Sequence, residues 1–455
     1  MKNLLWPGRL VLLGMGALAL GEVNAEEEAQ LPDGVNPCQE AKELIDAILQ
    51  RHYRGVGSPE ELSGRLNRAF RRWFYFIQLQ RRLTTEQVAT QFSIAEPLAL
   101  NQGGESFGMA CPSLQNNSEP FVSGITSQMI WNAVLNAFLS ELDPHSRIVH
   151  DTRAPLPESD LDRYSEIQYV NARDLPEEIL YLQLTSFGRG SSEQLEEAIE
   201  LRPNARGVIL DLRFNGGGLL EEARRVVDLF IDLGMVASAW NREGKASREM
   251  VYLATTPGYK TVAPLVVLVN DGSASASEVV AQAIQDHGRG IVVGRRTWGK
   301  GSVQRVYPLT ARRYLVLTQY MYHTMSGVSP QGIGVTPDVY APDPILERYL
   351  ASREVALVTG EEVGPMRESE IPYALPTVPR LNAGQRAAAG GEVDSNPIGA
   401  VMAQLPPAAF IVPSIQTEDP ALKISQAIVS AYAARCENFR AESCQGNSPL
   451  IAAAR

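Results

Sequence analysis

Residues 207–219 have the sequence GVILDLRFNGGGL, an apolar run followed by a glycine-rich turn. A short apolar run bounded by turn residues is typical of a strand that is buried on both faces. Apolar residues at helical spacing then predict a helix over 219–233. Three successive glycines suit the sharp connection, because glycine adopts backbone angles that other residues resist. The segment therefore predicts one strand–turn–helix unit of a parallel sheet.

The same alternation of strand and helix continues on both sides of this unit. Apolar runs predict strands over 179–184, 264–270 and 291–293, and a β-rich stretch through 314–321; helices are predicted over 191–200 and 278–286. Strands that alternate with helices indicate an α/β fold with a largely parallel sheet and covering helices.

Outside this core the sequence has a different character. Helical spacing predicts helices within 36–100, over 126–142 and over 419–436. Residues 364–415 are rich in proline, alanine and glycine, which predicts an irregular insert. We therefore expect four parts: a signal peptide over 1–25, an N-terminal helical region over 26–158, a core over 159–345 and a C-terminal extension over 346–455.

The bulk composition is that of a globular, exported protein. With 455 residues, 44% of them hydrophobic, the chain can bury sizeable cores. The net charge of −11 argues against a general nucleic-acid binder. Lys2, Arg9, the apolar run 10–20 and the short residues at 23–25 form a secretory signal pattern. That run is too short for a permanent anchor, so we expect a periplasmic or otherwise exported chain without an integral membrane span.

Cysteine usage fits the same compartment. The chain has four cysteines, and an even number in an exported protein permits two disulfides. The spacing does not fix the pairing: Cys436 and Cys444 are close enough for a local loop, and that pair would leave Cys38 and Cys111 to pair. The sequence has no C-x-x-C motif, so neither a redox function nor a metal or other cofactor is expected.

A first candidate for chemistry is GSASASE at 272–278, between a predicted strand and a predicted helix. Unpaired N–H groups at a helix N-terminus suit a serine alkoxide or a developing oxyanion. Ser275 and Glu278 also match the capping box S-x-x-E, in which Ser275 only caps the helix. Both interpretations stay open on these residues alone.

A second candidate is Lys300, which lies between Gly299 and Gly301. Burial beside the serine would lower the pKa of its amine and make it a usable general base. The alternative is a surface lysine in a turn; the spacing excludes a phosphate-binding loop. The glycines at 216–218 could supply one N–H of an oxyanion hole, or they form an ordinary turn.

Other catalytic arrangements find less support. The chain has five histidines: His52, His145, His150, His287 and His323. His287 ends the helix that begins near Ser275, and neither H-E-x-x-H nor G-x-S-x-G occurs. Lysine is therefore the better candidate base by elimination.

Taken together, these segments resemble the C-terminal processing peptidases, the tail-specific proteases. The resemblance rests on VNDGSASASE at 269–278, QDHGR at 285–289, GKGSVQ at 299–304, LRFNGGG at 212–218, QGIGVTPD at 331–338 and LDPHS at 142–146. It implies a ClpP/crotonase-like core, a nucleophile at Ser275 and its partner Lys300, which lies 25 positions later. It also implies that Gln304 orients the lysine and that backbone N–H groups of Ala276 and of Gly216 or Gly217 hold the oxyanion.

One departure concerns the PDZ domain that members of this family usually carry upstream of the core. The interval 151–177 is too short for a domain with its own core, so we expect no PDZ domain. The sequence, with this resemblance, thus predicts a serine endopeptidase with a Ser–Lys dyad that cleaves unfolded or extended polypeptides near their C-terminus. An adaptor protein or a second copy of the chain is a candidate partner. The alternatives are a non-catalytic binding or scaffold protein on the protease fold and an acyl-group hydrolase of crotonase-like architecture.

Overall fold

A computed structural model describes the core and parts of its flanks. The described residues are 37–53, 61–62, 65–66, 69, 127–150, 167–254, 260–309, 313–342, 367–381, 385 and 419–438. The signal peptide, Cys111 and Cys444 lie outside them, and the side chains of Cys38 and Cys436 are not described. The signal and both disulfides therefore stay predictions, as does the absence of a PDZ domain, since 151–166 also lie outside.

The core is a six-stranded sheet in the order β11-β8-β7-β4-β3-β2. All neighbouring pairs are parallel except β2 and β3, which are antiparallel. The strands are β2 (Val170–Leu175), β3 (Ile179–Leu184), β4 (Gly207–Asp211), β7 (Leu265–Val269), β8 (Ile291–Gly294) and β11 (Val339–Tyr340). The predicted α/β class with a parallel-rich sheet is confirmed.

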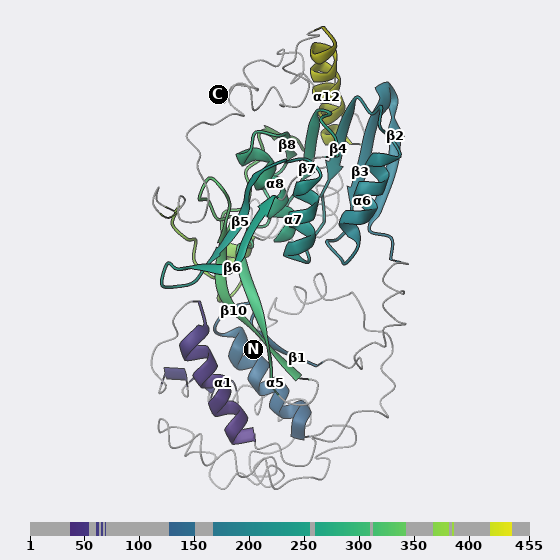
Figure 1. Ribbon diagram of the computed structural model, residues 1–455. Coiled ribbons are helices and arrows are strands. Elements are labelled where there is room, and N and C mark those ends of the chain that lie inside the picture. The colour runs from purple at the N-terminus through teal and green to yellow at the C-terminus, as the bar shows by residue number, and fades with distance from the viewer. Residues whose placement is uncertain are drawn as a thin grey trace, which may run out of the picture.

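Helices cover both faces of this sheet (Figure 1). Successive residues of a strand point to opposite faces. On one face, side chains such as Leu210 and Val267 pack with α6 (Ser191–Glu200), α7 (Leu220–Asp228) and α8 (Ala276–Asp286). On the other, Ile209 and Val266 pack with α12 (Pro420–Asn438), the predicted last helix.

A second sheet joins this core to the N-terminal helices. The long strand β10 (Arg313–His323) pairs at one end with β1 (Arg147–His150) and along much of its length with β9 (Ser302–Pro308). Its other end pairs with β5 (Gly234–Trp240), which pairs with β6 (Ala246–Ala254). Helices α1 (Pro37–Arg51) and α5 (Ser127–Ser140) pack in one cluster with Leu315 and Leu317 of β10 (Figure 1).

The structure differs from the sequence prediction in two places. Helix α7 ends at Asp228, before the predicted end at 233, and it is followed by β5 (Gly234–Trp240), a strand not predicted from the sequence. Residues 367–381, part of the predicted irregular insert, pack on the core: they contain the short 3₁₀ helix Glu368–Glu370 and bury Leu375 and Leu381. This segment lies next to the candidate site.

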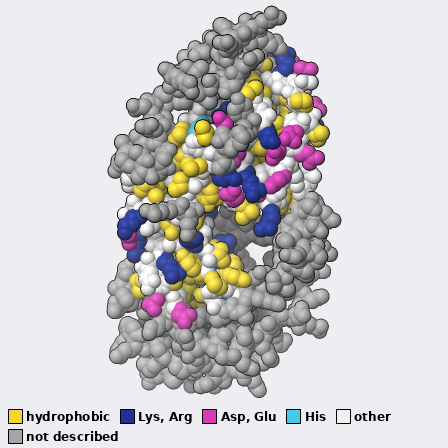
Figure 2. Space-filling model, in the orientation of Figure 1, with side chains coloured by type: hydrophobic (Ala, Val, Ile, Leu, Met, Phe, Trp, Pro, Cys, Tyr) yellow, Lys and Arg dark blue, Asp and Glu magenta, His cyan; other side chains and the backbone are white. Residues whose placement is uncertain are grey.

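Charged side chains of both signs alternate over the face formed by α6 and α7 (Figure 2). They form ion pairs there, including Arg225 with Glu193 at 2.6 Å and Lys260 with Glu196 at 2.5 Å. Among the described helices, none combines the length and the apolar character that crossing a bilayer requires.

Candidate active site

Ser275 occupies the sharp turn between β7 and α8. Its backbone has φ 55° and ψ −114°, which a non-glycine residue rarely adopts. Such strain is typical of functional sites, where the surroundings hold it in place. The hydroxyl makes no hydrogen bond within the described residues, not even the helix-capping bond, and the side chain is half-buried. By contrast, Ser273 Oγ donates to Leu212 O and Ser277 Oγ to Asn215 O, each at 2.8 Å.

The buried carboxylate of Glu278 holds the backbone of the serine turn and of the lysine turn together. Oε2 accepts the N–H groups of Ser275 and Lys300, both at 2.8 Å. Oε1 accepts the Gly299 N–H at 2.7 Å and the Thr297 hydroxyl at 2.5 Å. Burial raises the pKa of Glu278 to about 7, although the four hydrogen bonds oppose that rise. By accepting the Ser275 N–H, the Glu278 side chain forms its part of the predicted capping box.

Tyr322 of β10 ties the same two turns from their carbonyl side. Its hydroxyl oxygen lies 3.2 Å from both Ser275 O and Lys300 O, so its single proton is shared between the two carbonyls. The ring is buried, and burial raises the pKa of the phenol well above its ordinary value, so the group stays a donor. Glu278 and Tyr322 thus hold the main chains of Ser275 and Lys300 side by side.

The Lys300 amine points toward β9. Nζ donates to Gln304 Oε1 at 3.1 Å and to Ser302 O at 3.4 Å. Burial lowers the pKa of Lys300, and the charges of Glu368 and Glu278 oppose the lowering only in part. No hydrogen bond joins Lys300 Nζ to Ser275 Oγ among the residues that the structure describes; catalytic contacts are often long before substrate binds.

The glycine turn after β4 lies against the serine. The Gly217 N–H already donates to Asn215 Oδ1 at 2.9 Å, whereas Gly216 is exposed. Gly217 has φ +101°, and a β-carbon there would lie 2.8 Å from Ser275 Cβ and 2.8 Å from Ala274 O. Of the two candidate oxyanion donors in this turn, Gly216 is therefore the exposed one, and the Gly217 N–H is already used in a hydrogen bond.

Residues 178–341 match the model of peptidase family S41. The carboxy-terminal-processing protease of Bartonella bacilliformis is 41% identical over 178 residues, which are 38% of this chain and 41% of that protein. The carboxy-terminal processing protease CtpA of Bacillus subtilis is 36% identical over 194 residues, 40% of this chain and 39% of that protein. Residues 178–341 belong to peptidase family S41. The chain as a whole spans about two fifths of the length of these relatives.

A solved structure, the photosystem II D1 C-terminal processing protease, is 33% identical, with a TM-score of 0.35 over 38% of this chain and 48% of that one. The matched segment of the S41 domain contains Ser275, Lys300 and Gln304. Within the described residues, no group of three or more histidine, cysteine, aspartate or glutamate side chains is placed to hold a metal ion.

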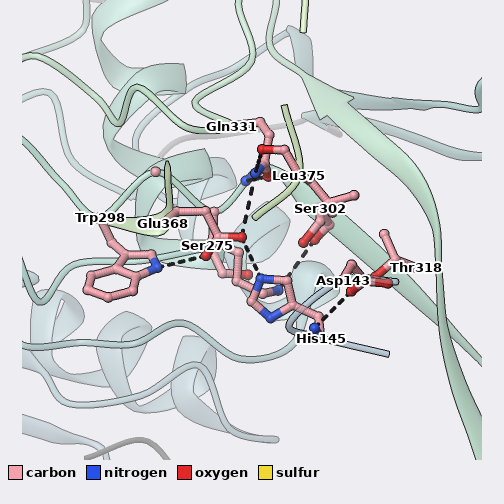
Figure 3. Close-up of polar contacts among 12 residues, drawn as sticks. Asp143, His145, Ser275, Trp298, Ser302, Thr318, Gln331, Glu368 and Leu375 are labelled. Atoms are coloured by element: carbon pink, nitrogen blue, oxygen red, sulfur yellow. Dashed lines mark hydrogen bonds and ion pairs between the residues drawn. The ribbon is translucent and has the colours of Figure 1, made fainter. Parts of the chain in front are cut away.

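The segment 367–381 contributes a buried carboxylate to the S41 site. Glu368 accepts hydrogen bonds from Trp298 Nε1 at 2.9 Å and Gln331 Nε2 at 3.5 Å, and His145 Nε2 lies 2.7 Å from it. Figure 3 shows these three side chains converging on Glu368 next to Ser275. Glu368 is fully buried, and its negative charge faces Lys300. Sequence reasoning missed Glu368 and Tyr322; only the LDPHS segment, which contains His145, carried a signal.

Gly217→Ala should disable the S41 domain, because the new methyl group would clash with Ser275 and the backbone angle would be strained. We expect kcat to fall about 10²-fold, as for a misplaced reacting group, and the free energy of unfolding to fall by about 1–3 kcal/mol. Urea unfolding and peptide cleavage measure the two effects. Gly216→Ala is the matched control for stability, since nothing lies within 4 Å of its added β-carbon. Equal unfolding midpoints for the two variants would contradict this account.

Glu278→Gln should uncouple the two turns. The amide can accept through one oxygen only, so it cannot satisfy the four donors that the carboxylate holds. We expect a loss of about 10²-fold in kcat from misplacement and of about 1–3 kcal/mol in the free energy of unfolding. Glu222→Gln is the control: this buried carboxylate accepts bonds from Ser191 and Ser192, away from the site. It should lose stability but keep kcat; a similar loss of kcat in both would show a general folding defect.

Proposed function

We propose that this chain is a serine endopeptidase of the carboxyl-terminal-processing type, with Ser275 as nucleophile and Lys300 as general base. One observation carries the proposal. Glu278 and Tyr322 bridge the main chains of both residues, while the Ser275 hydroxyl makes no hydrogen bond in the described part of the chain. The main chains of the proposed nucleophile and the proposed base are thus held together, and the serine hydroxyl is left free to react.

The reaction follows from these positions. Neutral Lys300 takes the proton of Ser275 as Oγ attacks the scissile carbonyl carbon. The oxyanion is held by the N–H groups of Ala276, at the N-terminus of α8, and of Gly216. Lys300 then returns the proton to the leaving amine, and an acyl-enzyme on Ser275 remains. Lys300 then takes a proton from water, which attacks that ester, and returns the proton to Ser275 Oγ as the second product leaves, which regenerates both groups.

The lowered pKa of Lys300 supports its role as a base. An amine is a base only when it is neutral, and burial favours the neutral form. Gln304 accepts one N–H of the amine and so orients it. No metal or cofactor has a part in these steps.

The proposed substrates are unfolded or extended polypeptides cut near their C-terminus in the cell envelope. Support comes from the printed names of the relatives, carboxy-terminal-processing proteases, and from the predicted signal peptide. A homo-oligomer or an adaptor is the proposed partner in the absence of a PDZ domain.

Two incubations test the proposed function. Denatured casein is incubated with the full chain, and the ends of the products are identified by mass spectrometry; short-chain acyl thioesters are the comparison. We expect cleaved casein, with cuts that cluster toward its C-terminus, and loss of cleavage after treatment with a fluorophosphonate. Thioester hydrolysis without peptide cleavage would favour an acyl hydrolase, and no turnover of either would favour a non-catalytic binding protein.

A further inference from the structure

A chain of four hydrogen bonds, part-buried at Lys300 and Gln304 and fully buried at Asp143, connects the Lys300 amine to the N-terminal helical region. Lys300 Nζ donates to Gln304 Oε1 at 3.1 Å, and Gln304 Nε2 donates to Thr318 Oγ1 at 3.1 Å. Thr318 Oγ1 donates to Asp143 Oδ1 at 2.9 Å, and His52 Nε2 lies 2.7 Å from Asp143 Oδ2. Thr318, Asp143 and His52 are fully buried. Figure 3 shows Asp143 and Thr318 side by side.

Three segments that lie far apart in the sequence supply this chain of hydrogen bonds. His52 directly follows α1, Asp143 follows α5, and Gln304 and Thr318 lie opposite each other on β9 and β10. The helices α1 and α5 thereby reach the catalytic lysine of the S41 core, although they lie outside the residues that match the family.

Asp143 determines which group donates and which accepts in each of these hydrogen bonds. Burial acts to raise the pKa of Asp143, but hydrogen bonds from His52 and Ser146 outweigh it and lower the pKa to about 2. The backbone N–H groups of His145 and Ser146 also donate to this carboxylate. An ionised carboxylate only accepts hydrogen bonds. The single proton of the Thr318 hydroxyl must therefore point to Asp143, which leaves its lone pairs for Gln304.

This direction decides which end of the Gln304 amide meets the lysine. Thr318 Oγ1 and Ser302 Oγ both accept from Gln304 Nε2, so the amide oxygen is turned to Lys300. A neutral amine has two N–H groups and one lone pair. Its N–H groups donate to Gln304 Oε1 and Ser302 O, and the lone pair is then left for the Ser275 proton. A reversed amide would offer an N–H to that lone pair instead.

We infer that Asp143 and Thr318 are positioning residues for the Lys300 base, and that they act through the orientation of the Gln304 amide. The inference rests on the proposed function, because it assigns these residues to the Ser275–Lys300 reaction. The buried His52–Asp143 pair makes the N-terminal helices part of the catalytic apparatus rather than a separate domain.

The test compares Thr318→Val with Thr318→Ser, using labelled denatured casein as substrate. Valine keeps the shape of threonine and removes the hydroxyl, while serine keeps the hydroxyl. We expect Thr318→Val to lower the plateau of kcat at least tenfold with KM within twofold of wild type. The acid limb of kcat should move to lower pH, because a turned amide places its N–H₂ group against the ammonium. The charged groups that face this amine are Glu368, Glu278, Arg147 and Asp143, and all stay in place. Thr318→Ser should keep kcat within about threefold.

Asp143→Leu is the second variant, because it removes the acceptor to which the Thr318 hydroxyl donates. The Thr318 proton would then turn to Gln304, so we expect the kcat loss of Thr318→Val. A wild-type pH profile and kcat in either variant, or an equal loss in Thr318→Ser, would overturn the inference. A wild-type chain that cleaves no casein, or a Ser275→Ala chain that cleaves as well as wild type, would instead refute the proposed function.

Discussion

Ser275→Ala should abolish cleavage of denatured casein, with kcat at least about 10⁴-fold below wild type, as expected when a nucleophile is removed. The protein should nevertheless fold normally. The Ser275 hydroxyl makes no hydrogen bond within the described structure, so alanine removes no structural contact and keeps the β-carbon. Urea unfolding should therefore show a change of less than about 0.5 kcal/mol in the free energy of unfolding, the usual range away from special features.

Ser277→Ala is the matched control for this variant. It lies two residues further along, and its buried hydroxyl donates to Asn215 O at 2.8 Å. Its loss should lower the free energy of unfolding by about 0.5–1.5 kcal/mol, because a buried hydrogen bond is removed while Asn215 O keeps the Ala274 N–H; cleavage should continue. We therefore expect Ser275→Ala to lose activity and keep its stability, and Ser277→Ala to lose stability and keep its activity. Persistent cleavage by Ser275→Ala, or its loss in a well-folded Ser277→Ala, would contradict the assignment of the nucleophile.

Lys300→Met should be as inactive as Ser275→Ala, with kcat reduced by about 10⁴-fold, because the serine then has no base. Its stability should respond to pH in a distinctive way. The pKa of Lys300 is lower in the folded than in the unfolded chain, so the unfolded chain holds the proton over a wider pH range. The stability of wild type relative to Lys300→Met should therefore rise as pH increases through the folded pKa toward the ordinary value of 10.5.

Urea unfolding at several pH values between neutrality and the ordinary pKa of lysine measures this difference. Lys260→Met serves as the control, because Lys260 forms exposed ion pairs with Glu196 and Glu200 away from the site. It should keep cleavage near the wild-type rate. A relative stability of Lys300→Met that is independent of pH would mean that folding does not favour the neutral amine.

The strands and helices of the core could be predicted because each carries its own local pattern. The apolar runs at β3, β4 and β7 and the helix over 191–200 are found where the sequence places them. Strands β5 and β6 are not among the strands that the sequence predicts. They form by pairing with each other and, for β5, with β10, and sequence pattern alone does not show pairing.

Within the site, the sequence indicates the residues whose motifs are local. Ser275, Lys300 and Gln304 lie in short glycine-marked segments, so a motif could single them out, and their catalytic roles remain the proposal made above. Tyr322, Thr318 and Glu368 act through contacts with residues far along the chain, such as His145 with Glu368, 223 positions apart. Nothing in the immediate neighbourhood of these residues signals such a contact.

The resemblance already selects Ser275 among the three serines, and the coordinates add an independent reason. The hydroxyls of Ser273 and Ser277 are used in structural hydrogen bonds, and that of Ser275 is not. The choice between the two glycines does need coordinates. Gly217 N–H is bonded to Asn215, which leaves Gly216 as the proposed oxyanion donor, and identical residue types in one run cannot reveal that bond.

The central claim is that Lys300 activates Ser275, and the rate at which a fluorophosphonate modifies the protein tests it most directly. The rate is measured by mass spectrometry across pH, in wild type and in Lys300→Met, and the modified residue is identified by peptide mapping. We predict a label on Ser275, a wild-type rate that rises with pH to a midpoint below 10.5, and a rate for Lys300→Met that is flat and at least about 10²-fold lower. Equal rates in the two proteins, or a label on another serine, would contradict the account.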